Sequence, residues 1–186
     1  MKKAAWLKAH AMVGTSTGVI TSIKVTASDG ADCPQLPELV EATKQHFAMA
    51  EVSADKAYLS NENLTAIEAT GAAPFIPFKL NSQQDGSSAW RKMHAVFILQ
   101  QDEFLAAYAK RNNVESTFSS VKRKFGGAVK SKTFTAQVNE ILCKVLCYNL
   151  GCLALAMQQL GIEPSFLGKV TACTDPGLPT MNKSTP

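Results

Sequence analysis

The sequence has little charge, few aromatic residues and no paired cysteine motif. Charged side chains make up 18% of its 186 residues, below the roughly 25% of an average globular protein. Hydrophobic residues account for 46%, which excludes a disordered or low-complexity chain and leaves enough apolar material for one core. Since a typical domain holds about 150 residues, the length favours one domain over two.

The five cysteines form no C-x-x-C pair, and their odd number argues against a disulfide framework or a zinc site. Cys143 and Cys147 are four residues apart in an expected helix, without a second pair or a nearby histidine, and are interpreted as small core residues. Residues 1–6 hold two lysines but no apolar stretch follows, which is not typical of a secretory signal. This cysteine usage favours a reducing cytoplasm.

A long uncharged hydrophobic run is also lacking. The most apolar stretch, 141–157, is interrupted by Lys144 and Asn149, whereas a membrane-spanning helix needs about 20 nearly uncharged residues. We therefore expect no membrane partner and interpret this stretch as a buried helix of a soluble domain.

The pattern of residues predicts a mixed α/β domain that opens with a β-hairpin. Strands over 9–14 and 19–26 flank the turn residues 15–18. We expect one unit over 1–168, followed by a disordered tail over 169–186 that is rich in Pro, Thr and Ser. The remaining expected elements are strands over 51–55 and 73–78, and helices over 34–49, 61–70, 90–100, 103–125 and 135–160, with Gly126 and Gly127 between the last two.

The segment 110–132 is strongly basic, although the net charge of the whole chain is only +4. It contains seven cations and a single acid, Glu115. A segment this one-sided favours contact with a polyanion, and the alternative is an ordinary solvated helix face. The cations are Lys110, Arg111, Lys122, Arg123, Lys124, Lys130 and Lys132.

Four side chains of this region fall on one stripe if residues 103–125 form a single helix: Tyr108, Arg111, Glu115 and Lys122. A glutamate among cations can belong to a surface ion-pair network, or it can be a metal-binding carboxylate whose neighbours grip phosphates. The second use requires further carboxylates. Asp55, at the end of the expected strand 51–55, is the best candidate.

The spacing Tyr108-x2-Arg111-x3-Glu115-x6-Lys122 resembles the Y-(2)-R-(3)-E-(6)-K signature of insertion-sequence transposases of the DDE class. Three further stretches are similar to this family: 6–10, 52–58 and 139–142. Together the resemblance extends over about residues 6–164.

The resemblance implies an RNase H-like mixed sheet with flanking helices. In such a domain three acids bind two divalent ions, Mg²⁺ or Mn²⁺, which drive in-line displacement at a DNA phosphate. Asp55 would be the second of these acids and Glu115 the third, both as catalytic residues and metal ligands.

Tyr108, Arg111 and Lys122 would hold the phosphates of the transposon end, and the adjacent Arg123 and Lys124 are expected to contact DNA as well. The implied partner is double-stranded DNA at transposon ends. The resemblance also implies a homo-oligomer when the protein is full length, and a place in the bacterial cytoplasm with the nucleoid.

The sequence departs from the family pattern at its start. In the family, the first acid lies on a strand that precedes the hairpin, whereas here only five residues precede Trp6. We therefore expect an N-terminally truncated domain without its first, central strand, a sheet disturbed at its centre, and impaired catalysis. The alternatives are a non-catalytic DNA-binding or inhibitory transposase fragment, and a small protein-binding module whose basic face is merely solvated.

Overall fold

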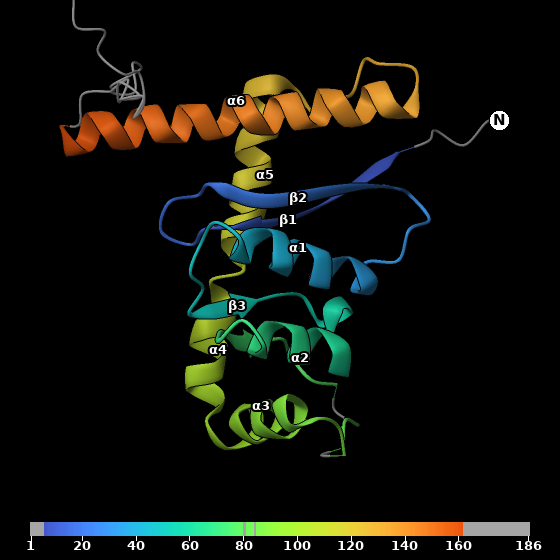
Figure 1. Cartoon of the computed structure of the whole chain (residues 1–186), viewed down its shortest axis with the longest axis vertical. Coiled ribbons are helices and arrows are strands. Elements are labelled where there is room, and N and C mark those ends of the chain that lie inside the picture. Colours follow the sequence, from blue (N-terminus) through green and yellow to red (C-terminus); the bar gives the residue numbers. More distant parts are fainter. Residues whose placement is uncertain (1–5, 80, 84, 162–186) are drawn as a thin grey trace, which may run out of the picture.

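The computed structural model describes residues 6–79, 81–83 and 85–161, so the expected tail over 169–186 lies outside the described residues. The described part is a mixed α/β structure, as the sequence predicts (Figure 1). Its elements are β1 (Leu7–Val13), β2 (Ile20–Ala27), α1 (Leu36–Lys44), β3 (Glu51–Ser53), α2 (Asn61–Glu68), β4 (Ala73–Phe75), α3 (Ser88–Leu99), α4 (Gln101–Ala109), α5 (Asn112–Phe125) and α6 (Phe134–Leu160), with short 3-10 helices η1 (Cys33–Gln35) and η2 (Lys56–Tyr58).

The strands form two separate pairs within the described residues. β1 and β2 make the expected antiparallel hairpin, from Leu7 opposite Ala27 to Val13 opposite Ile20. Gly18, whose φ of 68° suits glycine, closes the turn. β3 and β4 are parallel, with Val52 opposite Pro74, and β4 pairs with β3 alone, as expected for a strand that contains proline.

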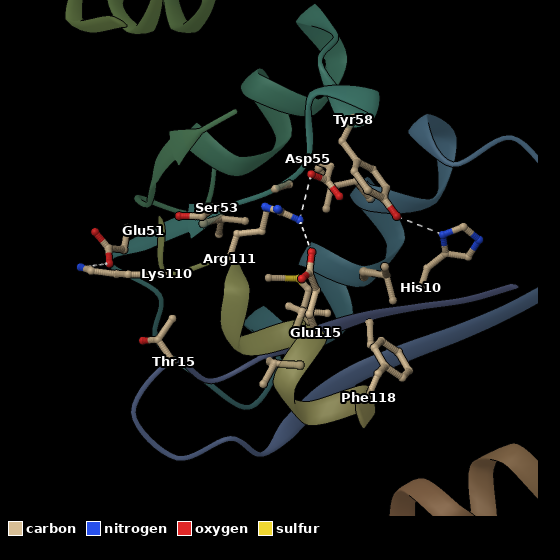
Figure 2. A pocket seen from close by; sticks show the side chains of 18 of the residues that line it. His10, Thr15, Glu51, Ser53, Asp55, Tyr58, Lys110, Arg111, Glu115 and Phe118 are labelled. Atoms are coloured by element: carbon tan, nitrogen blue, oxygen red, sulfur yellow. Dashed lines mark hydrogen bonds and ion pairs between the residues drawn. The ribbon is translucent and has the colours of Figure 1, made fainter. Parts of the chain in front are cut away.

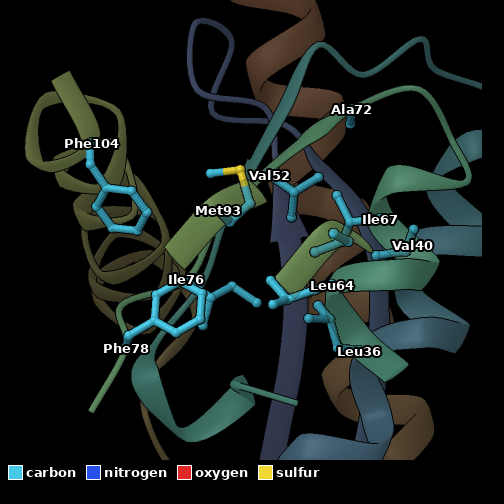
Figure 3. Close-up of a cluster of buried hydrophobic side chains, with 11 residues drawn as sticks. Leu36, Val40, Val52, Leu64, Ile67, Ala72, Ile76, Phe78, Met93 and Phe104 are labelled. Atoms are coloured by element: carbon cyan, nitrogen blue, oxygen red, sulfur yellow. The ribbon is translucent and has the colours of Figure 1, made fainter. Parts of the chain in front are cut away.

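The main hydrophobic core lies around the β3–β4 pair and joins helices α1 to α4 (Figure 3). Apolar residues at helical spacing in α1 and α2 supply one side of it, and Phe104 of α4 is fully buried on another. We call this part the main body. Its buried cluster comprises Leu36, Val40, Val52, Leu64, Ile67, Ala72, Ile76, Phe78, Ala89, Met93 and Phe104.

The expected single helix over 103–125 is wrong, because the structure contains two helices, α4 and α5, with a turn between them. In this turn the backbone N–H of Asn113 bonds to the carbonyl of Lys110, a tighter pattern than that of an α-helix. The asparagine pair at 112–113 is poor helix-forming sequence, which explains why the first helix ends before it.

The interpretation of 141–157 as a buried helix is also wrong. The helix is present as part of α6, but it lies across one end of the molecule (Figure 1), and only Val145 and Tyr148 in it are buried. By length and composition alone α6 could cross a membrane. This is weak evidence for a membrane span, because Lys144 and Asn149 of α6 bond to other parts of the protein. The hairpin and α5 cover one side of α6. Seven of its large apolar side chains are exposed: Phe134, Leu142, Leu146, Leu150, Leu153, Leu155 and Leu160.

Candidate functional site

The side chain of Arg111 lies between two carboxylates that come from distant parts of the sequence (Figure 2). Its Nη1 atom is 3.1 Å from Oδ1 of Asp55 and 2.9 Å from Oε1 of Glu115. The structure thus brings together the two acids that the sequence analysis singled out, with a guanidinium as the link between them.

Each of these residues occupies the end of an element. Asp55 follows β3 and precedes η2, with extended backbone torsions. Arg111 lies in the turn from α4 to α5, and Glu115 is in the first turn of α5, where the partial positive charge of a helix N-terminus favours a carboxylate. The turn that interrupts the expected helix therefore places Arg111 opposite Asp55.

Tyr108 completes this group, which we call the Arg111 cluster: Asp55, Tyr108, Arg111 and Glu115. The Tyr108 hydroxyl is 3.5 Å from Oδ1 of Asp55, a long hydrogen bond, and the Arg111 guanidinium lies 5.5 Å from the centre of the Tyr108 ring. The sequence spacing predicted that three of these four residues share one side of a helix, and the structure gathers them despite the turn.

The charges in the cluster set its protonation. Burial acts to lower the pKa of the Arg111 guanidinium, but Asp55, Tyr108 and Glu115 outweigh it and raise that pKa, so Arg111 stays charged. Burial and the neighbouring Asp55 raise the pKa of Tyr108, against a smaller opposing effect of Arg111. The hydroxyl of Tyr108 therefore keeps its proton at neutral pH and can donate a hydrogen bond.

The Arg111 cluster lines a pocket of about 210 Å³ that the hairpin and the parallel strand pair both border. Residues 9–13 of β1 and residues 51–55 in and after β3 contribute, together with Leu36 and Leu39 of α1 and Phe118 of α5. The pocket thus has an apolar floor and a charged group at Arg111.

Two interactions in this pocket were missed by the sequence analysis. His10 is buried, with its ring nitrogens 3.1 Å from the Tyr58 hydroxyl and 3.0 Å from Oγ1 of Thr26. Burial lowers the pKa of His10 and, with Asp32 and Asp55, raises that of Tyr58 to about 12, so both stay neutral at neutral pH. His10 and Tyr58 lie in two stretches that resemble the transposase family, which could have linked them.

The second missed interaction is the ion pair of Lys110 with Glu51, which joins the α4–α5 turn to β3 (Figure 2). Nothing in the sequence indicates that these two charges meet, since 59 positions separate them.

The predicted DNA-binding residues Lys122, Arg123 and Lys124 are all exposed on α5. Lys122 lines a second pocket, of about 420 Å³, between the hairpin, α5 and α6, and does not line the pocket of the Arg111 cluster. It follows Glu115 by two helical turns, or about 10 Å along the axis. The residues expected to bind phosphates therefore lie in two places, the Arg111 cluster and a basic stretch further along α5.

The carboxylates present do not match a two-metal centre. Among the described residues, no group of three or more His, Cys, Asp or Glu side chains could hold a metal ion. Mg²⁺ is often bound by one or two carboxylates with waters and phosphate oxygens, so Asp55 and Glu115 could share one ion if Arg111 moved away. They do not fit two ions, since four positive charges would face two carboxylates.

Comparison with known proteins gives one family match. Residues 2–150 match the family described as "Transposase DDE domain". No curated protein and no solved structure is significantly similar to this chain. The matched range includes the whole Arg111 cluster and the basic stretch of α5.

Proposed function

Because this chain belongs to the DDE transposase family, we propose that it binds the DNA of a transposon end but has severely impaired phosphoryl transfer. The observation that carries the proposal is the position of Arg111 between Asp55 and Glu115. If Asp55 and Glu115 are the second and third acids of the family, the Arg111 guanidinium lies where the metal ions would bind. We expect the protein to act in the bacterial cytoplasm, where it would meet the nucleoid.

We further propose that the two strand pairs are the two sides of an RNase H-like sheet that lacks its central strand. β1 and β3 both line the pocket, and each pairs with only one other strand among the described residues. The carbonyl of Ala50 and the N–H of Ala54 bond to the β4 side. By alternation, the backbone groups of Glu51 and Ser53 point to the other edge, where the pocket lies.

The residues of the cluster fit phosphate binding better than they fit catalysis. Arg111 has a planar set of donors that suits phosphate oxygens, and a DNA phosphate would compete with Asp55 and Glu115 for it. Tyr108 offers a protonated hydroxyl beside it. These two side chains would orient the backbone of the DNA, whereas the two carboxylates alone leave the charge of two divalent ions largely uncompensated.

The basic stretch of α5 supplies the rest of the proposed contact. Lys122, Arg123 and Lys124 are exposed, and the sequence continues to Lys132 with no further acid. Cations that neutralise DNA phosphates release counterions, so binding should weaken steeply as salt is raised.

Binding is tested by fluorescence anisotropy of the full chain with a labelled DNA duplex over a salt series. We expect the triple variant Lys122→Gln, Arg123→Gln, Lys124→Gln to reduce the logarithmic salt dependence by about 3, close to one for each lost phosphate contact. A matched control changes three exposed lysines of the main body, Lys44, Lys79 and Lys92, to Gln. If both triple variants lose affinity equally, or if the chain does not bind DNA at low salt, the DNA-binding proposal is wrong.

Catalysis is tested by incubating the chain with the same duplex in Mg²⁺ and in Mn²⁺. Impairment predicts little strand cleavage, and robust cleavage that Asp55→Asn abolishes would contradict it. Weak cleavage in Mn²⁺ that requires both Asp55 and Glu115 supports an impaired catalytic domain. Binding without any metal-dependent product favours the alternative, a non-catalytic DNA-binding or inhibitory fragment.

A further inference from the structure

His10 is a buried imidazole at the border of the pocket, and it joins two parts of the chain. Its side chain is 4% exposed and lies between Tyr58 of η2 and Thr26 of β2. Figure 2 shows the bond between the His10 ring and the Tyr58 hydroxyl, which connects the hairpin to η2. Among the described residues, His10 is the one buried side chain whose ordinary pKa is close to neutral.

The two hydroxyl neighbours of His10 suit a neutral ring. A neutral imidazole has one N–H donor and one nitrogen acceptor, and a hydroxyl can serve either of them. Within the part of the chain that the structure describes, the hydroxyls of Tyr58 and Thr26 have no other hydrogen-bond partner. A protonated ring has two donors, so both hydroxyls would have to accept, and the one that donates to the neutral ring would lose its acceptor.

The surroundings of His10 also oppose a proton on the ring. Burial lowers the pKa of His10 most, and Lys8 and Lys24 lower it further. Asp32 acts in the opposite direction, but its carboxylate is already paired with Lys8 at 3.0 Å. A histidine with a lowered pKa stabilises its folded surroundings above its ordinary pKa of 6.5, and this contribution is lost as the pH falls below that value.

No other histidine faces the pair of His10 and Tyr58 among the described residues. Lysine, aspartate and cysteine ordinarily titrate outside the range from about pH 5 to about pH 8, so His10 is the group of this set that responds within it. The charged and titratable groups around the pair are Lys8, Lys24, Asp32, Asp55 and Cys33.

The bond to Tyr58 links the hairpin to η2 directly. Among the described residues, the other side-chain hydrogen bonds from β1 and β2 to the α-helices of the main body end on α1, such as the bond of Ser22 to the carbonyl of Leu39. Breaking the His10 bond would therefore free η2 while the hairpin stays attached to α1. Since Asp55 immediately precedes η2, this release would reach the Arg111 cluster.

We propose that the bond between His10 and Tyr58 is a latch controlled by a proton. A neutral ring holds η2 to the hairpin, and a protonated ring releases η2 together with the border of the pocket at Asp55. The inference does not depend on DNA binding or on catalysis.

The test is amide hydrogen exchange of the full chain, followed by NMR at about pH 8 and about pH 5 and corrected for the intrinsic exchange rate at each pH. The reporter is the backbone N–H of Tyr58, which bonds to the carbonyl of Asp55 at 2.8 Å within η2. In wild type we expect its protection to fall by about tenfold at the lower pH, which corresponds to one pKa unit between the closed and the released state. Leu64 and Ile67 of α2 should stay protected at both pH values.

Three variants isolate the latch. His10→Gln keeps a donor and an acceptor but has no charge at either pH, so η2 should stay protected at both. His46→Gln changes an exposed histidine that follows α1 and should behave as wild type. Tyr58→Phe keeps the packing of the ring but lacks the hydroxyl, so its η2 should exchange fast at both pH values.

Wild-type protection of η2 that is the same at both pH values overturns the proposal, and so does an equal fall in His10→Gln. Tyr58→Phe with the pH dependence of wild type overturns it as well. The ring signals of His10 provide a check that needs no variant. Their titration midpoint should lie below the ordinary pKa of 6.5, and a midpoint at or above this value contradicts the latch.

Discussion

The main body and α6 use apolar residues in opposite ways. The main body buries eleven side chains in one cluster, whereas the cluster beneath α6 has four, two of which come from α6 itself. Yet, among the helices of the described residues, α6 is the one that is long and apolar enough to suggest a membrane span. The comparison teaches that the surface available to cover a helix decides its burial. Both apolar packing at Val145 and Tyr148 and the hydrogen bonds of Asn149 turn one side of α6 towards the protein.

The largest effect that would separate the two regions comes from truncating a leucine in each. Leu64 is fully buried in the main body, so Leu64→Ala should lower the free energy of unfolding by about 2–5 kcal/mol, through lost burial and a residual cavity. Leu155→Ala on α6 should change it by no more than about 0.5 kcal/mol. Urea denaturation measures both, and equal losses would remove the distinction.

A smaller effect is expected from the polar attachment of α6. Asn149→Ala leaves the N–H and C=O of Ile20 without their side-chain partner and should lower stability by about 1–3 kcal/mol. Hydrogen exchange should then speed up in α6 and β2 while the main body stays protected. Asn139→Ala, on the exposed side of the same helix, is the matched control, and unchanged exchange in the Asn149 variant would mean that apolar contacts alone hold α6.

The contacts of Glu140, which join α6 to the loop that precedes it, should respond to acid. The backbone N–H of Ser131, with its hydroxyl, Lys144 and the N–H of Lys130, lowers the pKa of Glu140 from 4.5 to about 2. A carboxyl with a lower pKa in the folded state stabilises the fold above its unfolded pKa, and this contribution is lost as the pH falls from about 4.5 towards 2. The melting temperature should depend less on pH across this range in Glu140→Gln than in wild type, whereas the exposed Glu103→Gln should keep the wild-type dependence. The same pH dependence in both variants would show that Glu140 does not have this role.

The smallest effect is expected from the exposed ion pair that ties the α4–α5 turn to the main body. Lys110→Gln removes the partner of Glu51, which should change the free energy of unfolding by about 0–1 kcal/mol, since solvent screens such pairs. A loss comparable to that of Asn149→Ala would show that this turn depends on the pair. Chemical denaturation in low and high salt provides the measurement.

Local signals in the sequence predicted much of the fold. Alternating residues around the turn at 15–18 gave the hairpin, and helical spacing with Gly126 gave the separation of α5 from α6. The boundaries differ where the chain turns early, because α1 ends at Lys44 instead of residue 49 and β3 ends at Ser53 instead of residue 55. Such ends depend on tertiary contacts that a local pattern does not contain.

The candidate site could be predicted in part. Spacing placed Tyr108, Arg111 and Glu115 together, and the position of Asp55 at the end of an expected strand made it the best candidate for a second carboxylate, so the members of the cluster were available from the sequence. The contact of Arg111 with both acids could not be predicted from the sequence, because it depends on the turn between α4 and α5. The prediction that residues 141–157 form a buried helix was wrong for a related reason. Hydrophobicity indicates that a helix needs a partner, but not whether that partner lies within the chain.

The bond between Asn149 and Ile20 has a consequence for the order in which the molecule is made. The two residues are 129 positions apart, so at about 5–20 residues per second a ribosome adds Asn149 on the order of 10 s after Ile20. During that interval, in which the residues of the main body are themselves added, the N–H and C=O of Ile20 can bond to water but not to Asn149. Attachment of α6 to the hairpin is therefore among the last contacts that the growing chain can make.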